Sequence, residues 1–375
     1  MKRFLVFLLA VLMVCTLCAC GADKPADTDK GGDTATTAST AESTTTTTQA
    51  ESTTTTEAEG TTTEGEGTTT ATEAPTTEGT TAPTTKPTEK PTTTKAPTTT
   101  GTTKAPTTTT AAPVIDKGNV PERFYLLAVG NSFSVDAMKN HLFPMLKAAG
   151  CKDIRLGILY IGGGSLDSHY DNVRLDRAKY EYYETTDGNW TVTPEYKAST
   201  AFALTDWDIV TLQQVSGHSG RGISYENLDA LVDLIRPQIG DAKMHWQMTW
   251  AYQQNSTHND FGYYNKDQAR MYKSIIRATN ERIVNNPDFV GIIPSGTSIQ
   301  NLRTSSLGDT LTVDGYHLKD SYGDYTAALT WFCHFTGADA RSTTYRPAEI
   351  ADHFDEIAES VNNAIKTPLA ITECK

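Results

Sequence analysis

The stretch "FYLLAVGNSFSVDAMKNHLFPMLKAAG", residues 124–150, decides the fold. Its first part, residues 124–130, is a short, continuous apolar run, which is typical of a buried strand. Residues 135–150 carry apolar side chains at helical spacing and end in glycine, which predicts an amphipathic helix. Ser132 and Ser134 lie between the two elements. The sequence therefore places two serines where a buried strand leads into a helix.

The same order of strand and helix continues along the chain. Four further apolar strands are predicted at residues 154–160, 206–214, 242–250 and 288–296. Amphipathic helices are predicted at residues 224–240, 265–286, 320–337 and 347–365. Alternation of this kind indicates a parallel sheet that helices cover on both faces. We therefore predict an α/β domain with a central five-stranded parallel sheet, whose ligands bind beyond the carboxyl ends of the strands.

One segment interrupts this alternation. Residues 170–199 are polar and rich in tyrosine, and "TTDGNWTVT" has the pattern of a hairpin that turns at Asp187 and Gly188. Because the segment follows the second strand directly, it is interpreted either as a wall or lid over the site or as a surface excursion.

The first third of the chain has a different composition. Residues 21–112 contain no Val, Ile, Leu, Met, Phe, Tyr, Trp or Cys, and threonine and proline recur throughout. A segment with no apolar side chains to bury does not offset the entropy cost of ordering. We predict a disordered Thr/Pro-rich linker at residues 21–114 and a single folded domain at residues 115–375.

The amino terminus has the layout of an export signal. Lys2 and Arg3 precede an apolar run and then small residues. "LCAC-G" resembles the bacterial lipobox, which implies that residues 1–20 are a lipoprotein signal peptide and that Cys20 is lipidated. An ordinary signal peptide or a membrane-spanning helix are the alternatives, although the run is shorter than the roughly 20 residues of a span. The expected location is the extracellular face of a bacterial membrane, through a lipid anchor.

Charge and cysteine content argue against a nucleic-acid-binding protein and against a zinc protein. The net charge of −13, with no basic stripe, argues against a nucleic-acid partner. Outside the export signal, Cys151, Cys333 and Cys374 lie far apart without CxxC spacing, which allows at most one disulfide and indicates no zinc site. There is no HExxH or comparable cluster of ligands. No metal or cofactor is expected.

A histidine near the carboxyl terminus is a candidate base for a serine nucleophile. A serine hydroxyl needs a neighbouring base, which a third group usually orients. His317 follows Asp314 by three residues in "TVDGYHLKDSYGDY", after the last predicted strand. One tight turn then places both side chains on the same side. The alternative for an isolated DxxH is a helix N-cap aspartate beside an incidental histidine.

Two other loops at the same edge of the sheet carry candidate hydrogen-bond donors. Glycines in "IGGGSLDSH" follow the second strand, where a backbone N–H can approach a substrate closely. Gln213 and Gln214 in "LQQVSGHSG" end the third strand and carry side-chain amides. Such donors stabilise a developing oxyanion. Turn formation and packing are the alternative roles for these residues.

Together these blocks resemble the SGNH (GDSL-like) hydrolase superfamily over residues 122–340. The likeness is greatest to a branch of bacterial secreted proteins with "GNSFS", "GGS", "LQQ" and "DGYHL" blocks. It implies a flavodoxin-like three-layer α/β/α sandwich and a Ser-His-Asp triad. By position, Ser132 matches the nucleophile, His317 the base and Asp314 the carboxylate, and Ser134 matches no family residue and is interpreted as a helix-start group.

The resemblance also implies an oxyanion hole, with two departures from the family pattern. Its members here are Ser132, Gly163 or Gly164, and, by position only, Gln213 or Gln214. "LQQVS" lacks the asparagine of the family's third block, which leaves the third donor to one of the two glutamines. The other departure is Asn131, where many members have aspartate.

The function expected from this resemblance is a serine esterase that removes small acyl groups, commonly acetyl, from sugars. Aromatic residues after the fourth strand are candidates for stacking on a sugar ring, with a core role as the alternative: Trp246, Trp250 and Tyr252. The expected partners are an ester-bearing small molecule or glycan and, through the lipid anchor, the membrane. An acyltransferase with the same triad and a non-catalytic glycan-binding lipoprotein are the alternative functions.

Overall fold

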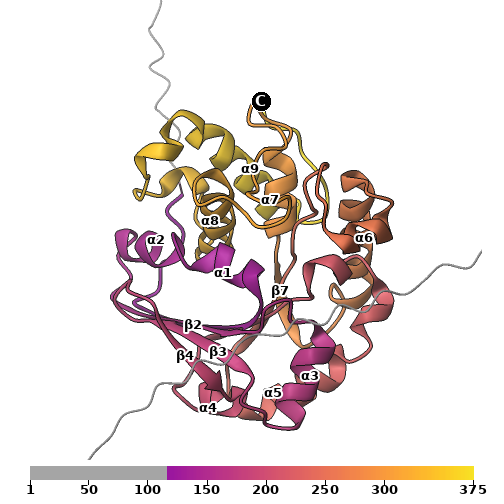
Figure 1. Cartoon of the computed structure of the whole chain (residues 1–375). Helices are drawn as coiled ribbons and strands as arrows, with labels where there is room; N and C mark the ends of the chain where they lie inside the picture. The colour runs from indigo at the N-terminus through magenta and orange to yellow at the C-terminus, as the bar shows by residue number, and fades with distance from the viewer. Residues whose placement is uncertain (1–115) are drawn as a thin grey trace, which may run out of the picture. The chain divides into compact units, whose positions relative to one another are not determined.

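A seven-stranded sheet lies at the centre of residues 116–375, the part of the chain that this computed structural model describes (Figure 1). The strands are β1 (Arg123–Gly130), β2 (Asp153–Tyr160), β3 (Tyr180–Thr185), β4 (Thr191–Tyr196), β5 (Ile209–Leu212), β6 (Lys243–Gln247) and β7 (Phe289–Ile293). Their order across the sheet is β4-β3-β2-β1-β5-β6-β7.

The five strands predicted from apolar runs form the parallel part of the sheet. They are β2, β1, β5, β6 and β7, and each pairs in parallel with its neighbours in this order. Numbered by themselves, they follow the order 2-1-3-4-5 of flavodoxin-like folds. In such a sheet the order in which strands are added reverses between the first and third strands. Ligands bind at this switch point, beyond the carboxyl ends of these two strands. These ends are Gly130 of β1 and Leu212 of β5.

The prediction of five strands was wrong, because the tyrosine-rich segment adds two more. β3 pairs antiparallel with β2 and then with β4, so the hairpin extends the sheet and is neither a lid nor a surface excursion. Tyr180 and Tyr182 of β3 are buried. At the end of the hairpin turn, Nε1–H of Trp190 donates to the carbonyl of Lys139, 2.8 Å away. The hairpin thereby covers an edge of β2 that would otherwise be unpaired.

Helices cover both faces of the sheet. The α-helices are α1 (Ser132–Met138), α2 (Leu142–Ala148), α3 (Leu166–Arg174), α4 (Ala198–Phe202), α5 (Leu228–Ile235), α6 (Gln268–Arg282), α7 (Ser295–Leu302), α8 (Tyr322–Thr336) and α9 (Phe354–Lys366). Figure 1 shows α1, α2, α7, α8 and α9 on one face of the sheet and α3, α4 and α5 on the other. The domain therefore has the predicted three layers.

The helix predicted at 135–150 is two helices, α1 and α2, separated at residues 139–141. α1 begins at Ser132, three residues earlier than predicted, because the side chain of Asn131 caps it. Helices α3, α4 and α7 are short and were missed by the sequence prediction.

The remaining predictions about the chain's organisation have different outcomes. Cys20, the signal peptide and the linker lie outside the described residues. Cys151, Cys333 and Cys374 are buried free thiols, so no disulfide forms among these three. Within residues 116–375, no helix has the length and apolar character needed to cross a membrane.

Candidate active site

Ser132 is the first residue of α1, directly beyond the carboxyl end of β1. Gly130 ends the strand, and Oδ1 of Asn131 accepts the backbone N–H of Phe133 at 3.0 Å, which starts the helix. A Cβ at Gly130 would lie 2.4 Å from Oγ of Ser134, so only glycine fits at this bend. Ser132 is half-buried, and its side chain lies at the edge of the sheet where ligands bind in this class of fold.

The DGYH block, Asp314–His317, forms a tight loop that orients the imidazole. Oδ1 of Asp314 accepts the backbone N–H groups of Tyr316 and His317, at 3.1 and 2.8 Å. Gly315 turns the chain with a φ of +94°, which glycine adopts without strain. The N–H of Val313 donates to the carbonyl of His317 at 2.9 Å and closes the loop. The aspartate therefore shapes the loop as well as contacting the histidine.

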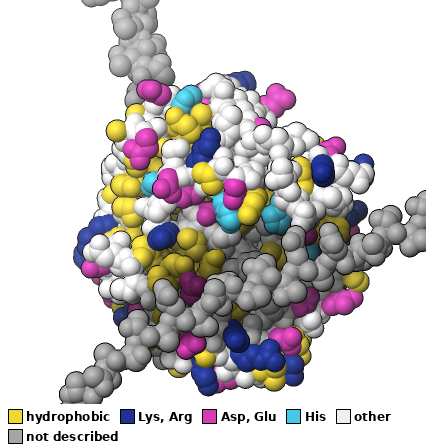
Figure 2. Space-filling view, viewed as in Figure 1, with side chains coloured by type: hydrophobic (Ala, Val, Ile, Leu, Met, Phe, Trp, Pro, Cys, Tyr) yellow, Lys and Arg dark blue, Asp and Glu magenta, His cyan; other side chains and the backbone are white. Residues whose placement is uncertain are grey.

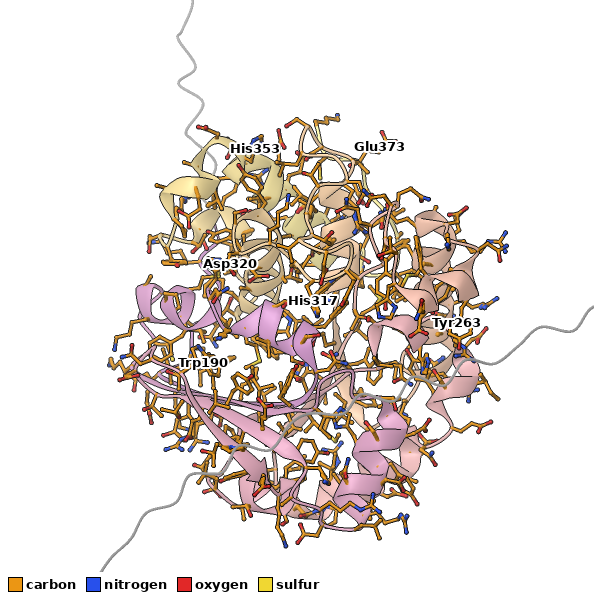
Figure 3. All side chains as sticks on the ribbon, in the orientation of Figure 1. Trp190, Tyr263, His317, Asp320, His353 and Glu373 are labelled. Carbon is orange, nitrogen blue, oxygen red and sulfur yellow. The ribbon has the colours of Figure 1, made fainter. Side chains whose placement is uncertain are left out.

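The structure brings Ser132, His317 and Asp314 into one hydrogen-bonded chain. Nε2 of His317 lies 2.8 Å from Oγ of Ser132, and Nδ1 lies 2.6 Å from Oδ2 of Asp314. Figure 3 shows His317 beside the start of α1. An ionised carboxylate only accepts hydrogen bonds, so Nδ1 carries the hydrogen and Nε2 is left with a lone pair. Nε2 is thus positioned to take the proton of the serine hydroxyl.

The loop keeps Asp314 ionised. Partial burial raises the pKa of its carboxyl group, but hydrogen bonds from His317 and Tyr316 outweigh this and hold the pKa below its usual value. The carboxylate that faces Nδ1 is therefore charged throughout the neutral and mildly acidic range. A charged partner at this position stabilises an imidazolium when His317 gains a proton.

The glycine block forms a turn that uses the backbone N–H of Gly164 and leaves those of Gly162 and Gly163 without an acceptor among the described residues. The N–H of Gly164 donates to the carbonyl of Ile161 at 2.8 Å, and Gly163 has a φ of +64°. Among residues 116–375, the backbone N–H groups of Ser132 and Gly163 have no acceptor within the protein. Of the predicted backbone donors of the oxyanion hole, these two remain free. The prediction for Gly164 is corrected, because its N–H closes the turn.

The side chain of Gln213 is occupied by two neighbours. Its Nε2 donates to Oδ1 of Asn131 at 2.6 Å, and its Oε1 accepts the hydroxyl of Ser134 at 2.7 Å. Asn131 in turn donates from Nδ2 to the carbonyl of Gly164 at 3.0 Å. These side chains are buried. Gln213 therefore joins the ends of β1 and β5 and the glycine turn.

The side chain of Gln214 is saturated with hydrogen bonds. Oε1 accepts the backbone N–H groups of Leu166 and Val215, at 3.1 and 2.8 Å. Nε2 donates to the carbonyl and the hydroxyl of Ser224, at 2.6 and 3.1 Å. Both amide hydrogens have acceptors, so none is left for an oxyanion. The predicted role as the third oxyanion donor is corrected for Gln214, whose amide holds loops together instead. For Gln213, one amide hydrogen is bonded to Asn131, and its role as a donor stays a prediction.

Ser134 faces away from the open surface. It is buried, and its hydroxyl lies between Oε1 of Gln213 and Oε1 of Gln247, 2.7 and 3.1 Å away. It lies in the first turn of α1, but Asn131 rather than Ser134 caps the helix. Of the two serines in "GNSFS", only Ser132 has a histidine within hydrogen-bond distance.

The predicted sugar-stacking aromatics belong to the core. Trp246, Trp250 and Tyr252 are at most 1% exposed, so no sugar ring can stack on them in this structure. Trp250 instead stacks on Phe133, with the ring centroids 4.1 Å apart, and its Nε1–H donates to the carbonyl of Tyr316 at 2.8 Å. The predicted stacking role is corrected: Trp250 supports both the nucleophile helix and the histidine loop.

Other aromatic and imidazole side chains lie beside His317. The ring of Tyr316 is 4.2 Å from that of His317, and the ring of His258 is 4.8 Å from that of Tyr316. Tyr263 lies farther from His317, beside His218, and is 56% exposed, with the guanidinium of Arg221 4.0 Å from its ring centroid. Figure 2 shows histidine side chains gathered at the centre of this face. Sequence reasoning missed His258, because its loop, "NSTHND", shows no motif and meets the DGYH loop only in the folded chain.

Comparisons with known proteins assign the chain to a protein family. A family model described as a domain of unknown function, DUF4886, matches residues 125–365. The chain belongs to the DUF4886 family. It is similar to the crystal structure of a DUF4886 protein from Bacteroides uniformis, with 38% identity and a TM-score of 0.65 over 67% of this chain and 98% of that one. The comparison with curated proteins gave no match.

More distant solved structures include named hydrolases. One is a GDSL-like lipase from Bacteroides thetaiotaomicron, with 11% identity and a TM-score of 0.34 over 56% of this chain and 85% of that one. Another is an acetyl xylan esterase, with 14% identity and a TM-score of 0.35 over 55% and 98%. Likenesses at these TM-scores carry no argument about activity. The function of this DUF4886 protein therefore has to be inferred from the geometry of its site.

Proposed function

We propose that this DUF4886 protein is a serine esterase that hydrolyses small acyl esters, acetyl above all, on carbohydrates. The observation that carries the proposal is the chain from Oγ of Ser132 through both ring nitrogens of His317 to Oδ2 of Asp314, with links of 2.8 and 2.6 Å. A serine with a base at this distance, and a base with an ionised orienting partner, is the arrangement that activates a hydroxyl for acyl transfer.

The reaction follows from the positions of these groups. Oγ of Ser132 attacks the ester carbonyl carbon while Nε2 of His317 takes the hydroxyl proton, and Asp314 stabilises the imidazolium that forms. The free N–H groups of Ser132 and Gly163 are the donors for the oxyanion. His317 then returns the proton to the departing alcohol. Water, activated by the same histidine, attacks the acyl-serine and releases the acid.

The test compares the two serines of the "GNSFS" block in the full-length chain. Ser132→Ala should abolish turnover of p-nitrophenyl acetate, leaving at most the residual acceleration of about 10³–10⁴ over water that a site without its triad retains. Ser134→Ala, the matched control, should reduce thermal stability while keeping most of kcat. Equal rates for Ser132→Ala and wild type would reject the triad, and the absence of turnover in wild type would favour a glycan-binding protein.

The class of substrate is tested separately. Acetylated oligosaccharides and polysaccharides would be incubated with wild type and with Ser132→Ala, and free acetate would be measured. Release by wild type alone supports a carbohydrate esterase. Loss of acetyl from one glycan, with its appearance on a second glycan and no free acetate, would identify acyl transfer instead.

The proposed location is the extracellular face of the bacterial membrane, held by a lipid on Cys20. The support is the lipobox-like "LCAC-G" that ends the apolar run. Cys20→Ala should prevent incorporation of labelled fatty acid and release the protein from membranes. Retention of the label in that variant would contradict the anchor.

A further inference from the structure

Asp136 lies on the nucleophile helix and contacts the histidine loop. It is four residues after Ser132 in α1, so both side chains leave the same face of the helix. Oδ2 of Asp136 accepts the backbone N–H of Leu318 at 2.9 Å. Leu318 directly follows His317. One carboxylate therefore joins the helix that carries the nucleophile to the loop that carries the base.

The hydrogen bond from Leu318 to Asp136 attaches the histidine loop on the side that faces α1, where the loop has few other hydrogen bonds. On the opposite side, the loop is bonded through the carbonyls of Gly315 and Tyr316 to Gln253 and Trp250. Among residues 116–375, the bond from Leu318 to Asp136 is the one hydrogen bond between α1 and the loop other than the contact of His317 with Ser132 itself. Without it, the helix and the loop would be joined through Trp250, which stacks on Phe133 and donates to Tyr316, and through the hydrogen bond between base and nucleophile.

The charge on Asp136 is also placed to act on His317. Burial raises the pKa of Asp136 to about 6, the N–H of Leu318 and the His317 imidazole lower it, and neighbouring carboxylates raise it. The titratable groups that face Asp136 are His317, Asp314 and Asp320 in the loop region, Asp324 on α8 and Tyr160 on β2. Burial and the charge of Asp136 raise the pKa of Asp324 to about 9, which keeps that neighbour protonated at neutral pH. Asp136 is then charged above its pKa and neutral below it.

We propose that Asp136 is a positioning residue that holds the His317 loop against the nucleophile helix and whose negative charge favours the imidazolium formed during acyl transfer. The proposal rests on the proposed esterase function for its kinetic consequences. Its structural part, the attachment of the loop through Leu318, does not depend on turnover.

Two variants separate the hydrogen bond from the charge. Asp136→Ala removes both and should lower kcat for p-nitrophenyl acetate up to about 100-fold, the effect of a misplacement of roughly 1 Å, with KM nearly unchanged. Asp136→Asn keeps an acceptor for Leu318 and should recover most of that loss. Asp171→Asn, an exposed aspartate on α3 in the other helix layer, is the control and should match wild type. Wild-type kcat in Asp136→Ala, or no recovery in Asp136→Asn, would overturn the proposal.

The pH profile gives a readout that a merely structural role would not change. In wild type, the negative charge of Asp136 is lost as the pH falls through about 6, so the advantage in kcat/KM that wild type keeps over Asp136→Asn should be present above pH 6 and disappear below it. An advantage of the same size at every pH, or none at any pH, would contradict a role for the charge.

Amide hydrogen exchange tests the attachment independently of the esterase reaction. The peptide that contains Leu318 should exchange faster in Asp136→Ala than in wild type and at the wild-type rate in Asp136→Asn. If wild type shows no turnover, the proposed function fails, yet this exchange difference still decides whether Asp136 holds the loop. Unchanged exchange in Asp136→Ala would reject the attachment.

Discussion

The triad and the glutamine pair lie at the same edge of the sheet and differ in how their polar groups are used. In the triad, Nε2 of His317 contacts only the hydroxyl of Ser132, and both groups lie on half-buried residues. Gln213 and Gln214 are buried, and their amides are bonded to Asn131, Ser134 and Ser224 and to backbone groups. One region keeps reactive groups accessible, and the other uses polar groups to fasten loops.

The difference shows how a polar residue near a site should be judged. An amide whose two hydrogens and acceptor oxygen already have partners has nothing left to offer a substrate. A buried amide that loses such a partner instead destabilises the fold. The number of unoccupied donors and lone pairs, rather than the residue type or its distance from the nucleophile, therefore separates the reacting groups from the supporting ones.

The largest expected effect is on the triad side of this comparison. Asp314→Asn would place an amide beside Nδ1 and favour the wrong tautomer of His317, so kcat for an ester substrate should fall roughly 10⁴-fold. The melting temperature should change little, because Asp314 is partly exposed. Asp171→Asn is the control for a change of charge. A loss of less than about tenfold, measured by steady-state kinetics, would show that Asp314 does not orient the base.

A smaller effect on activity and a larger one on stability are expected for the glutamines. Gln214→Leu leaves the N–H of Leu166 and the carbonyl of Ser224 without their partner, and each such buried group costs about 1–3 kcal/mol. Denaturant unfolding should show this loss, while kcat of the folded protein should fall less than about tenfold. Gln238→Leu, an exposed glutamine, is the control.

The opposite pattern for Gln214→Leu would change the assignment of the oxyanion donors. Unaltered stability with a decrease of about 10²–10³ in kcat is the result that removal of an oxyanion donor produces. It would place the amide of Gln214 in the hole and contradict its role as a tie between loops.

The smallest effect is expected at the glycine turn, where the structure offers a close match. Gly163 and Gly308 have φ values of +64° and +59°, and a Cβ at either would meet no atom within 4 Å. Alanine at either position should cost about 1–2 kcal/mol of stability, because the left-handed conformation is strained with a side chain. Only Gly163→Ala should lower kcat, by a few-fold, because its N–H is a proposed donor. Equal kcat values for the two variants would remove Gly163 from the site.

The sequence predicted the parallel sheet and the positions of Ser132 and His317 because both depend on local patterns. A buried strand that leads into a capped helix, and a DxxH turn before α8, are encoded within a few residues. Since parallel strands end at the same edge, the two blocks were expected to meet there. In the structure they do meet. Ser132 and His317 are 185 residues apart in sequence, and Oγ of Ser132 lies 2.8 Å from Nε2 of His317.

The errors share a different cause. Nothing within "LQQ" indicates that Asn131 and Ser224 will meet the two amides, since those partners are brought in by packing. The positions of Trp246 within a strand and of Trp250 shortly beyond it likewise give no information on whether the rings face the core. The pattern of residues 170–199 predicted a hairpin, but its pairing with β2 depends on an open strand edge elsewhere in the chain.

The central claim, that Ser132 is a nucleophile activated by His317, is tested most directly by covalent labelling. A fluorophosphonate reacts with a serine whose hydroxyl is activated, and mass spectrometry of the digested protein locates the adduct. We expect one adduct per chain, on Ser132, and its loss in His317→Ala. Labelling of Ser134 or another residue, no labelling, or full labelling of His317→Ala would contradict the claim.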